Sequence, residues 1–221
     1  IHPDYNLISY VGIDGIEISE AIPDDIEENI VSLVGEGAAA IQLSDGWYGS
    51  LDAFYRNKGY WLRNQLESDT LQLSWVIPEE EVLFSNGRIK KKHIQIPEEI
   101  SFKQSSQQEF YFVGNINMDE FSVTSNDWIV AYNNNVIVGS RQWNGKYTDI
   151  PAMGFDGTEA TVGYCTLLDT PSFKLYVYET GELIDLESTN ISTWSDLSTT
   201  IVPQLNQSQI IPDHFEFSYP Y

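Results

Sequence analysis

The sequence predicts a mainly β fold, in which a small α+β module with one helix is followed by an antiparallel β-sandwich. Residues 127–186 contain three β-rich runs separated by turn residues, with no segment of helical period between them. The front of the chain instead combines short β runs with one stretch of helical period. We therefore expect an α+β module over residues 1–77, a linker over residues 78–107 and a β-sandwich domain over residues 108–221.

A helix is expected in the first module, where a strand over residues 6–11 gives way to a different period. Pro23 lies near the start of this stretch, acidic residues crowd its first turn and Gly35 follows its end. These signals predict a helix of about three turns over residues 22–34. Its apolar residues fall on one helical face: Ile22, Ile26, Ile30, Leu33 and Val34.

Short strands are expected in the rest of the first module, over residues 38–43, 47–51, 59–63 and 70–77. A turn at residues 44–46 separates the first two of them. In the last one, the alternation of Leu71, Leu73 and Trp75 predicts one buried face and one wet face.

In the second module, strands are expected over residues 110–113, 127–132, 136–141, 160–167, 173–178 and 182–186. The asparagines at residues 133–135 predict a tight hairpin, because asparagine tolerates the left-handed conformation that such a turn needs. A second turn is expected at residues 180–181. The end of the chain alternates aromatic residues over residues 213–219, which predicts a final strand.

The charge balance argues against several classes of partner. The chain has 11 Lys and Arg residues against 33 Asp and Glu residues, for a net charge of -22 at pH 7. Such a surface repels phosphate backbones and anionic lipids, so we expect neither nucleic-acid binding nor attachment to a membrane surface. We expect no membrane insertion, because no run of about 18 apolar residues is present. The acidity suits a protein in a salty medium and equally an acidic soluble protein with no special partner.

Two segments are candidate contacts with a partner, which we expect to be another copy of the chain or another structural protein. The basic cluster at residues 88–93 either binds an acidic face or forms a solvated hairpin of the linker. The predicted final strand can add to its own sheet or to the open edge of a neighbouring sheet. The residues expected to make these contacts are Lys90, Lys91, Lys92, Phe215, Phe217 and Tyr219.

No catalytic constellation is recognisable in the sequence. The histidines lie beside no evident nucleophile, and the G-x-S-x-G and zinc-ligand patterns are absent. Cys165 lies in an apolar strand pattern, which predicts a buried and unreactive thiol. A pair of catalytic carboxylates for glycoside hydrolysis stays an open alternative, because the separation that the pair needs is a distance in space and not a spacing along the sequence. We therefore expect the protein not to be an enzyme.

Calcium is the one ion that the sequence brings into consideration. Residues 156–159 and residues 133–135 offer oxygen ligands on turns, as calcium prefers. Neither segment has the full calcium-loop pattern, and turn formation alone explains both. We therefore expect no metal or other cofactor, with calcium as the alternative.

Aromatic side chains are the candidate ligand-binding groups. Trp47 and Trp143 stand at the edges of turns, whereas Trp61 and Trp128 lie inside predicted strands and are expected in the core. Together with Tyr147, the first two either form a flat platform on which a sugar stacks or pack into the core. An exposed aromatic row on one sheet face would favour carbohydrate binding.

Two parts of the sequence also resemble a known family. N-L-I-S-Y, A-I-P-D-D-I-E-E-N-I-V-S-L-V-G-E-G-A-A-A and K-G-Y-W resemble a module that recurs in large secreted proteins of marine bacteria and in structural proteins of marine phages. D-W-I-V-A-Y-N-N-N-V-I-V-G-S-R-Q-W and P-S-F-K-L-Y resemble the β domain that often sits beside it. The resemblance covers most of the chain. It implies a building block that is extracellular, on the cell surface or on the virion surface, and it carries over no catalytic residues.

These observations lead to three functional hypotheses. The first is a non-enzymatic structural or adhesive protein that acts through self-association or partner binding. The alternative is a carbohydrate-binding module, with surface carbohydrate as its partner. A glycoside hydrolase is the third.

Overall fold

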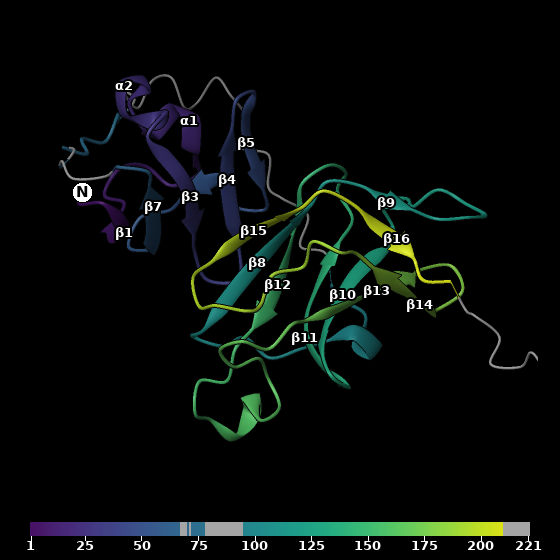
Figure 1. Cartoon of the computed structure of the whole chain (residues 1–221). Helices are drawn as coiled ribbons and strands as arrows, with labels where there is room; N and C mark the ends of the chain where they lie inside the picture. Colours follow the sequence, from purple (N-terminus) through teal and green to yellow (C-terminus); the bar gives the residue numbers. More distant parts are fainter. Residues whose placement is uncertain (67–69, 71, 78–94, 210–221) are drawn as a thin grey trace, which may run out of the picture.

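The structure is a computed structural model of the chain, and it describes residues 1–66, 70, 72–77 and 95–209. The fold is mainly β, as predicted, with several mostly antiparallel sheets and only short helices. Figure 1 shows a smaller module from the first part of the chain beside a larger module from the second part. No helix in the described part of the chain is long and apolar enough to cross a membrane.

The first module is built on a five-stranded antiparallel sheet in the order β1-β7-β3-β4-β5. Its strands are β1 (Asp4–Ser9), β3 (Ile30–Val34), β4 (Ala39–Leu43), β5 (Gly46–Gly49) and β7 (Gly59–Asn64). One face is covered by the ladder of β2 (Ile16–Glu17) with β6 (Ala53–Phe54) and by the helices α1 (Ile18–Ala21) and α2 (Asp24–Glu27). Leu33 and Leu62 of the sheet share a buried apolar cluster there with Ile18 and Phe54.

The predicted helix over residues 22–34 is wrong. The helices α1 and α2 have four residues each, and the second half of the stretch forms strand β3. Pro23 separates the two helices because a proline disfavours helical geometry in the preceding residue, and Ile22 is extended at φ -96° and ψ 130°. Strand β3 is rich in β-branched residues and pairs on both sides, with β4 and β7. The apolar residues of the predicted helical face are nevertheless all buried.

The strand predicted over residues 70–77 is also wrong, because residues 72–77 make no strand pairing. They run instead along the helical side of the first module. The backbone N–H of Val76 donates to the carbonyl oxygen of Ala21 at 2.9 Å. Trp75 packs edge-on against two aromatic rings of the buried cluster. This segment therefore closes the core of the module without joining its sheet.

The second module is a sandwich of two sheets. A six-stranded sheet in the order β11-β10-β13-β14-β16-β9 faces a three-stranded sheet in the order β12-β8-β15. The strands are β8 (Gln108–Val113), β9 (Ile116–Asn117), β10 (Trp128–Asn133), β11 (Val136–Gln142), β12 (Thr148–Met153), β13 (Ser172–Val177), β14 (Glu182–Glu187), β15 (Thr199–Val202) and β16 (Leu205–Gln207). Only the pairs β15 with β8 and β16 with β9 are parallel among the described strands. Side chains from both sheets form one core, in which Ile129 and Leu175 meet Tyr111 and Ile150.

One predicted strand of this module is wrong, and four observed strands were not predicted: β9, β12, β15 and β16. Residues 160–167 form the end of a short 3-10 helix, η2 (Glu159–Thr161), and a loop in which a single bridge joins Cys165 to Gly154. Strand β12 was missed because it contains Pro151, and a proline argues against a strand with neighbours on both sides. Strand β12 tolerates the proline because β8 is its one paired neighbour in the described sheet.

Strand β8 joins the two modules because its side chains alternate between two cores. Tyr111 and Val113 belong to the core of the sandwich. Phe110 and Phe112 point the other way and pack on Val34, Ala39 and Ile41, which belong to the sheet of the first module. Both faces of β8 are therefore buried.

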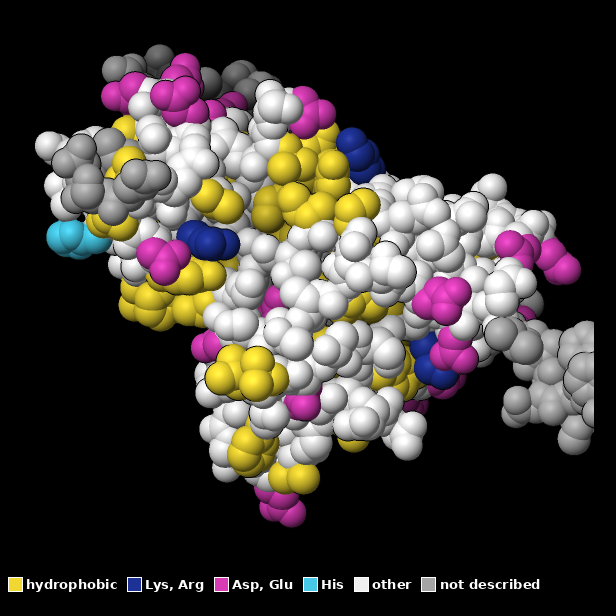
Figure 2. Space-filling view, in the orientation of Figure 1, with side chains coloured by type: hydrophobic (Ala, Val, Ile, Leu, Met, Phe, Trp, Pro, Cys, Tyr) yellow, Lys and Arg dark blue, Asp and Glu magenta, His cyan; other side chains and the backbone are white. Residues whose placement is uncertain are grey.

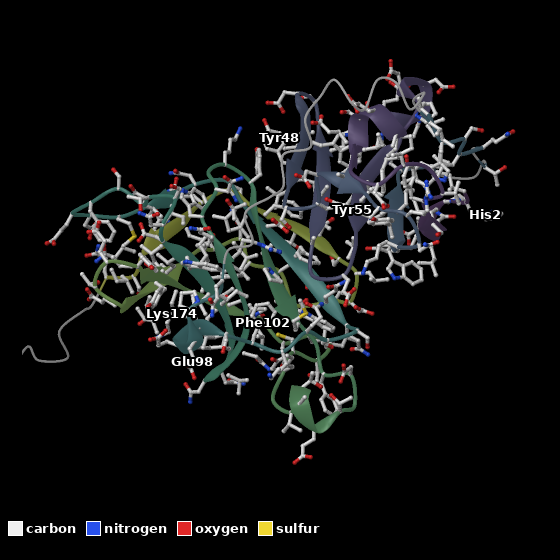
Figure 3. All side chains as sticks on the ribbon, turned by 180° about the vertical axis from the view of Figure 1, so that it is seen from behind. His2, Tyr48, Tyr55, Glu98, Phe102 and Lys174 are labelled. Atoms are coloured by element: carbon white, nitrogen blue, oxygen red, sulfur yellow. The ribbon has the colours of Figure 1, made fainter. Side chains whose placement is uncertain are left out.

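The second half of the predicted linker lies against the second module. Ile100, in the short 3-10 helix η1 (Glu98–Ile100), is buried against Trp128 and Val130 of β10. Phe102 packs on the sandwich core, and Figure 3 shows both Glu98 and Phe102 on this module. The predicted final strand and the basic cluster at residues 88–93 lie outside the described residues.

Candidate ligand-binding cleft

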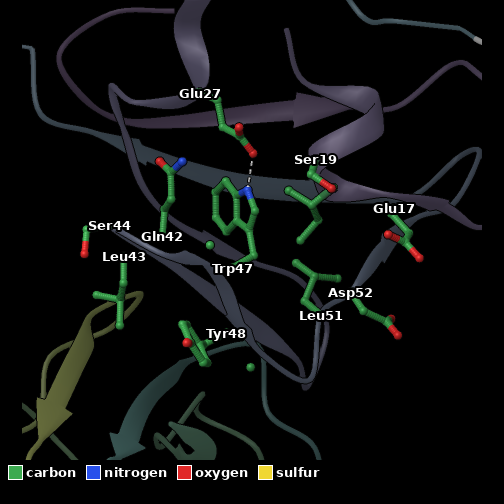
Figure 4. Close-up of a pocket in the computed structure, with 13 residues that line it drawn as sticks. Glu17, Ser19, Glu27, Gln42, Leu43, Ser44, Trp47, Tyr48, Leu51 and Asp52 are labelled. Atoms are coloured by element: carbon green, nitrogen blue, oxygen red, sulfur yellow. Dashed lines mark hydrogen bonds between the residues drawn. The ribbon is translucent and has the colours of Figure 1, made fainter. Parts of the chain in front are cut away.

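An open cleft of about 540 Å³ lies beside β5, the edge strand of the sheet in the first module (Figure 4). Its walls come from segments that are apart in the sequence: β5 with the end of β4, the start of α1, the end of α2 and the residues after β5. The polar and aromatic residues that line it are Glu17, Ser19, Glu27, Gln42, Ser44, Trp47, Tyr48 and Asp52.

Trp47 forms the aromatic wall of the cleft. It lies opposite Gln42 of β4, and its indole packs against the buried cluster of the first module. The indole Nε1–H donates to the carboxylate of Glu27, the last residue of α2 (Figure 4). The turn of α2 is closed by a hydrogen bond from the N–H of Glu27 to the carbonyl oxygen of Pro23, at 3.0 Å. The short helix therefore holds the carboxylate where it orients the ring.

The cleft is acidic. Glu17, Glu27 and Asp52 contribute carboxylates, and none of the residues that line the cleft is Lys or Arg. Ionised carboxylates accept hydrogen bonds and donate none, so they suit a ligand rich in hydroxyl or ammonium groups. An anionic ligand would be repelled.

Tyr48 follows Trp47 along β5 and points to the other face of the sheet, because successive side chains of a strand alternate. There its ring meets Tyr147 of the second module edge-on, with centroids 5.0 Å apart. Figure 3 shows Tyr48 on the side of the first module that faces the second. Its hydroxyl donates to Asp45 at 2.9 Å, and this hydrogen bond raises the pKa of Tyr48. The ammonium of Lys146 lies 4.6 Å from the Tyr147 ring centroid.

The structure separates the three predicted ligand-binding residues. Trp47 lines the cleft, and Tyr147 lies one aromatic contact away from it. Trp143 packs against the core of the sandwich instead. Trp128 is buried as expected, whereas Trp61, which was expected in the core, is 36 % exposed. The predicted partner-contact residues lie outside the described part of the chain.

Sequence reasoning missed the acidic residues of the cleft. Glu17, Glu27 and Asp52 come from separate segments, and only the packing of α1, α2 and β5 brings them together. The sequence did carry a signal for Tyr48. Trp47 and Tyr48 are adjacent and follow a turn directly, so a short strand there has one aromatic ring on each face.

Of the two turns considered for calcium, residues 156–159 are closed by side-chain hydrogen bonds, and residues 133–135 form the backbone turn of a hairpin. The carboxylate of Asp156 accepts hydrogen bonds from Oγ1 of Thr161 at 2.7 Å and from Oγ1 and N of Thr158 at 2.8 and 3.1 Å, and these bonds lower the pKa of Asp156. Asn134 has φ 53°, the left-handed conformation expected for the hairpin between β10 and β11. No group of three or more Asp, Glu, His and Cys residues in the described part of the chain is placed to hold a metal ion.

Buried titratable groups lie in the sandwich core, away from the cleft. Glu109 accepts hydrogen bonds from the N–H of Ser195 at 2.7 Å and from Oγ1 of Thr200 at 2.9 Å, and burial raises its pKa to about 7. Cys165 is fully buried, as predicted, and burial raises the pKa of its thiol to about 12. Both groups are enclosed in packed structure.

No family model matches the chain, and no curated protein or solved structure matches it.

Proposed function

We propose that the protein is a non-enzymatic adhesive protein that binds carbohydrate in the cleft beside Trp47. The observation that carries this proposal is the contact between Trp47 and Glu27, which orients an aromatic ring in the wall of an open cleft. The apolar face of a sugar ring packs on an aromatic side chain, while carboxylate and amide oxygens accept hydrogen bonds from its hydroxyls. An apolar wall with a few convergent polar groups is the usual form of a small-ligand site.

The charge of the cleft narrows the class of sugar. With Glu17, Glu27 and Asp52 in its walls and no cation among its lining residues, the cleft favours neutral or amine-bearing saccharides over sulfated or uronic ones. The absence of a cationic lining residue also fits the net charge of -22, which repels polyanions at longer range.

We also propose that the protein acts outside the cell, on a cell surface or on a virion. This part rests on the resemblance of its two modules to extracellular and virion building blocks. In such a setting, surface carbohydrate and other copies of the chain are the partners that the proposal requires.

The test is affinity electrophoresis of the full chain in gels that contain a neutral polysaccharide, an amine-bearing one (chitosan) or a sulfated one. We expect retardation by the neutral or amine-bearing polymer and none by the sulfated polymer. Trp47→Ala should weaken binding about tenfold or more, because it removes the stacking surface. Tyr178→Ala is the matched control, because Tyr178 is an exposed aromatic residue outside the cleft. Retardation that is equal in the Trp47→Ala and wild-type proteins would refute the proposal.

The same polymers test the glycoside hydrolase hypothesis. This hypothesis stays an alternative because three carboxylates line one cleft, those of Glu17, Glu27 and Asp52. A rise in reducing ends that Glu27→Gln abolishes would replace the binding proposal with an enzymatic one. We expect no such rise.

A further inference from the structure

Residues 154–168 project from the second module and carry an exposed apolar surface. This segment is the green loop at the bottom of Figure 1, and yellow side chains gather on the same projection in Figure 2. We call its exposed apolar residues the apolar tip: Phe155, Val162, Leu167 and Leu168, which are 40, 66, 70 and 71 % exposed. A group of large apolar side chains that remains in water is typical of a contact surface.

The projecting segment is held in one conformation. The backbone N–H of Phe155 donates to the carbonyl oxygen of Cys165 at 2.8 Å. The carboxylate of Asp169 accepts hydrogen bonds from N and Oγ1 of Thr166 at 2.8 and 2.9 Å. Leu168 has φ 77°, which is strained for a leucine and is maintained by the surrounding bonds. Because the tip is already ordered, covering it costs little further conformational entropy.

A groove of about 210 Å³ lies at the junction of the two modules, and we call it the junction groove. Leu7 of β1 is paired directly with Trp61 of β7, on the sheet face that also carries Val34. The second module covers Val34 but leaves Leu7 64 % exposed and Trp61 36 % exposed. Gln104 and Ser106 of the second module form the opposite wall. This arrangement explains why a tryptophan inside a strand is exposed here.

The apolar tip and the junction groove are neighbours on the molecule. The backbone N–H of Ser106, in the wall of the groove, donates to the carboxylate of Asp156 at 3.4 Å, and Asp156 follows Phe155 of the tip. Oγ of Ser105 donates to the carbonyl oxygen of Gly154 at 2.7 Å. A projection beside a groove is self-complementary, because one two-fold axis brings each projection to the groove of the other copy.

Charge favours the groove as the place where the tip docks. Acidic residues surround the tip: Asp156, Glu159 and Asp169. Beside the groove, Lys58 pairs with Glu36 at 3.3 Å and Arg63 pairs with Asp4 at 3.4 Å. The rim is therefore close to neutral on a protein whose net charge is -22, so the acidic tip meets less repulsion there than over the surface at large.

We propose that the protein forms a two-fold symmetric dimer in which the apolar tip of each copy docks in the junction groove of the other. Leu167 and Leu168 then replace water over Leu7 and Trp61 in both halves of the contact. The dimer carries two copies of the Trp47 cleft, so that a surface with repeated sugars binds it with an avidity that one copy lacks. The dimer does not depend on what the cleft binds.

The experiment is sedimentation equilibrium of the full chain over a wide range of concentration. We expect a reversible monomer–dimer equilibrium in the wild-type protein. Leu167→Asp in the tip and Leu7→Asp in the groove should each raise the dimer dissociation constant about tenfold or more, because each places a charge in an apolar contact. Leu183→Asp is the matched control, because Leu183 is an exposed leucine on β14, outside both surfaces, and it should leave the constant unchanged.

Mixing the two variants gives a second and more specific readout. A dimer of Leu167→Asp with Leu7→Asp keeps one intact tip and one intact groove in the same contact, so the mixture should dimerise more tightly than either variant alone. This recovery also shows that both variants are folded. A wild-type protein that stays monomeric at the highest concentration would overturn the proposal. So would variants that dimerise like the wild type, or a mixture that shows no recovery.

Discussion

Arg141 and Asp149 form an ion pair at the junction of the two modules, with 3.1 Å between Nη2 and Oδ2. Asp149 is buried, and the same carboxylate oxygen accepts hydrogen bonds from Oγ of Ser50 at 2.7 Å and from the N–H of Ala39 at 3.3 Å, both in the first module. Nη2 of Arg141 also donates to the carbonyl oxygen of Gly37 at 2.8 Å. Burial raises the pKa of Asp149, and the charge of Arg141 opposes that rise. The two modules thus share one buried polar centre.

Removing this carboxylate should destabilise the whole chain. Asp149→Ala leaves the guanidinium of Arg141 without its counter-ion and the hydroxyl of Ser50 without this acceptor, which we expect to cost about 3 kcal/mol of unfolding free energy. Urea unfolding measures this difference. Asp185→Ala, which breaks the solvent-accessible pair with Lys174, is the control and should cost no more than about 1 kcal/mol. Equal losses in the two variants would show that the junction does not depend on the buried pair.

The burial pattern could be predicted more reliably than the secondary structure. Ile22, Ile26 and Ile30 fall on one helical face, and they are also buried as two short helices and a strand, so apolar spacing alone did not distinguish these arrangements. What decides the outcome is pairing with β4 and β7, which is a tertiary contact absent from the local pattern. For the same reason Trp47 was foreseen in the candidate site, whereas Glu27, which orients it from another segment, was not.

Ile30 gives a direct test of the burial of this apolar face. Ile30→Asp should unfold the first module, because Ile30 is 2 % exposed in the buried cluster and a carboxylate there would lose its hydration without gaining a partner. Thermal melting followed by circular dichroism measures the loss. Val11→Asp introduces the same group at an exposed position of the same module and should melt close to the wild type. A normal melting temperature for Ile30→Asp would mean that the end of α2 and the start of β3 are not packed as described.

Cys165 should be unreactive in the folded protein. Its side chain is fully buried, and burial raises the pKa of the thiol to about 12, so the nucleophilic thiolate is scarce at neutral pH. A thiol-reactive dye should label the wild-type protein only after denaturation. Leu183→Cys supplies the control, since it adds an exposed thiol on β14, outside the proposed dimer contact, and should be labelled at once. Fast labelling of Cys165 in the native protein would show that residues 154–168 open in solution.

Glu109 should make the protein less stable as the pH rises. Its ordinary pKa of 4.5 applies to the unfolded chain, and burial raises the pKa to about 7 in the folded protein. Between these two values the folded protein holds a proton that the unfolded chain has released, so the free energy of unfolding falls with rising pH. The fall amounts to about 3 kcal/mol and is complete above the folded-state pKa.

Glu109→Gln should remove this dependence, because an amide does not titrate. Its oxygen can accept from the N–H of Ser195 while its nitrogen donates to the hydroxyl of Thr200, which reverses one hydrogen bond and keeps both contacts. Urea unfolding of both proteins between pH 4.5 and pH 8 gives the test. We expect the variant to gain stability relative to the wild type as the pH rises through this range. Glu182→Gln, at an exposed position of β14, removes one negative charge in the same way and is the control for the change in net charge. A difference between Glu109→Gln and the wild type that stays constant across this range would show that the carboxyl of Glu109 titrates alike in the folded and unfolded states.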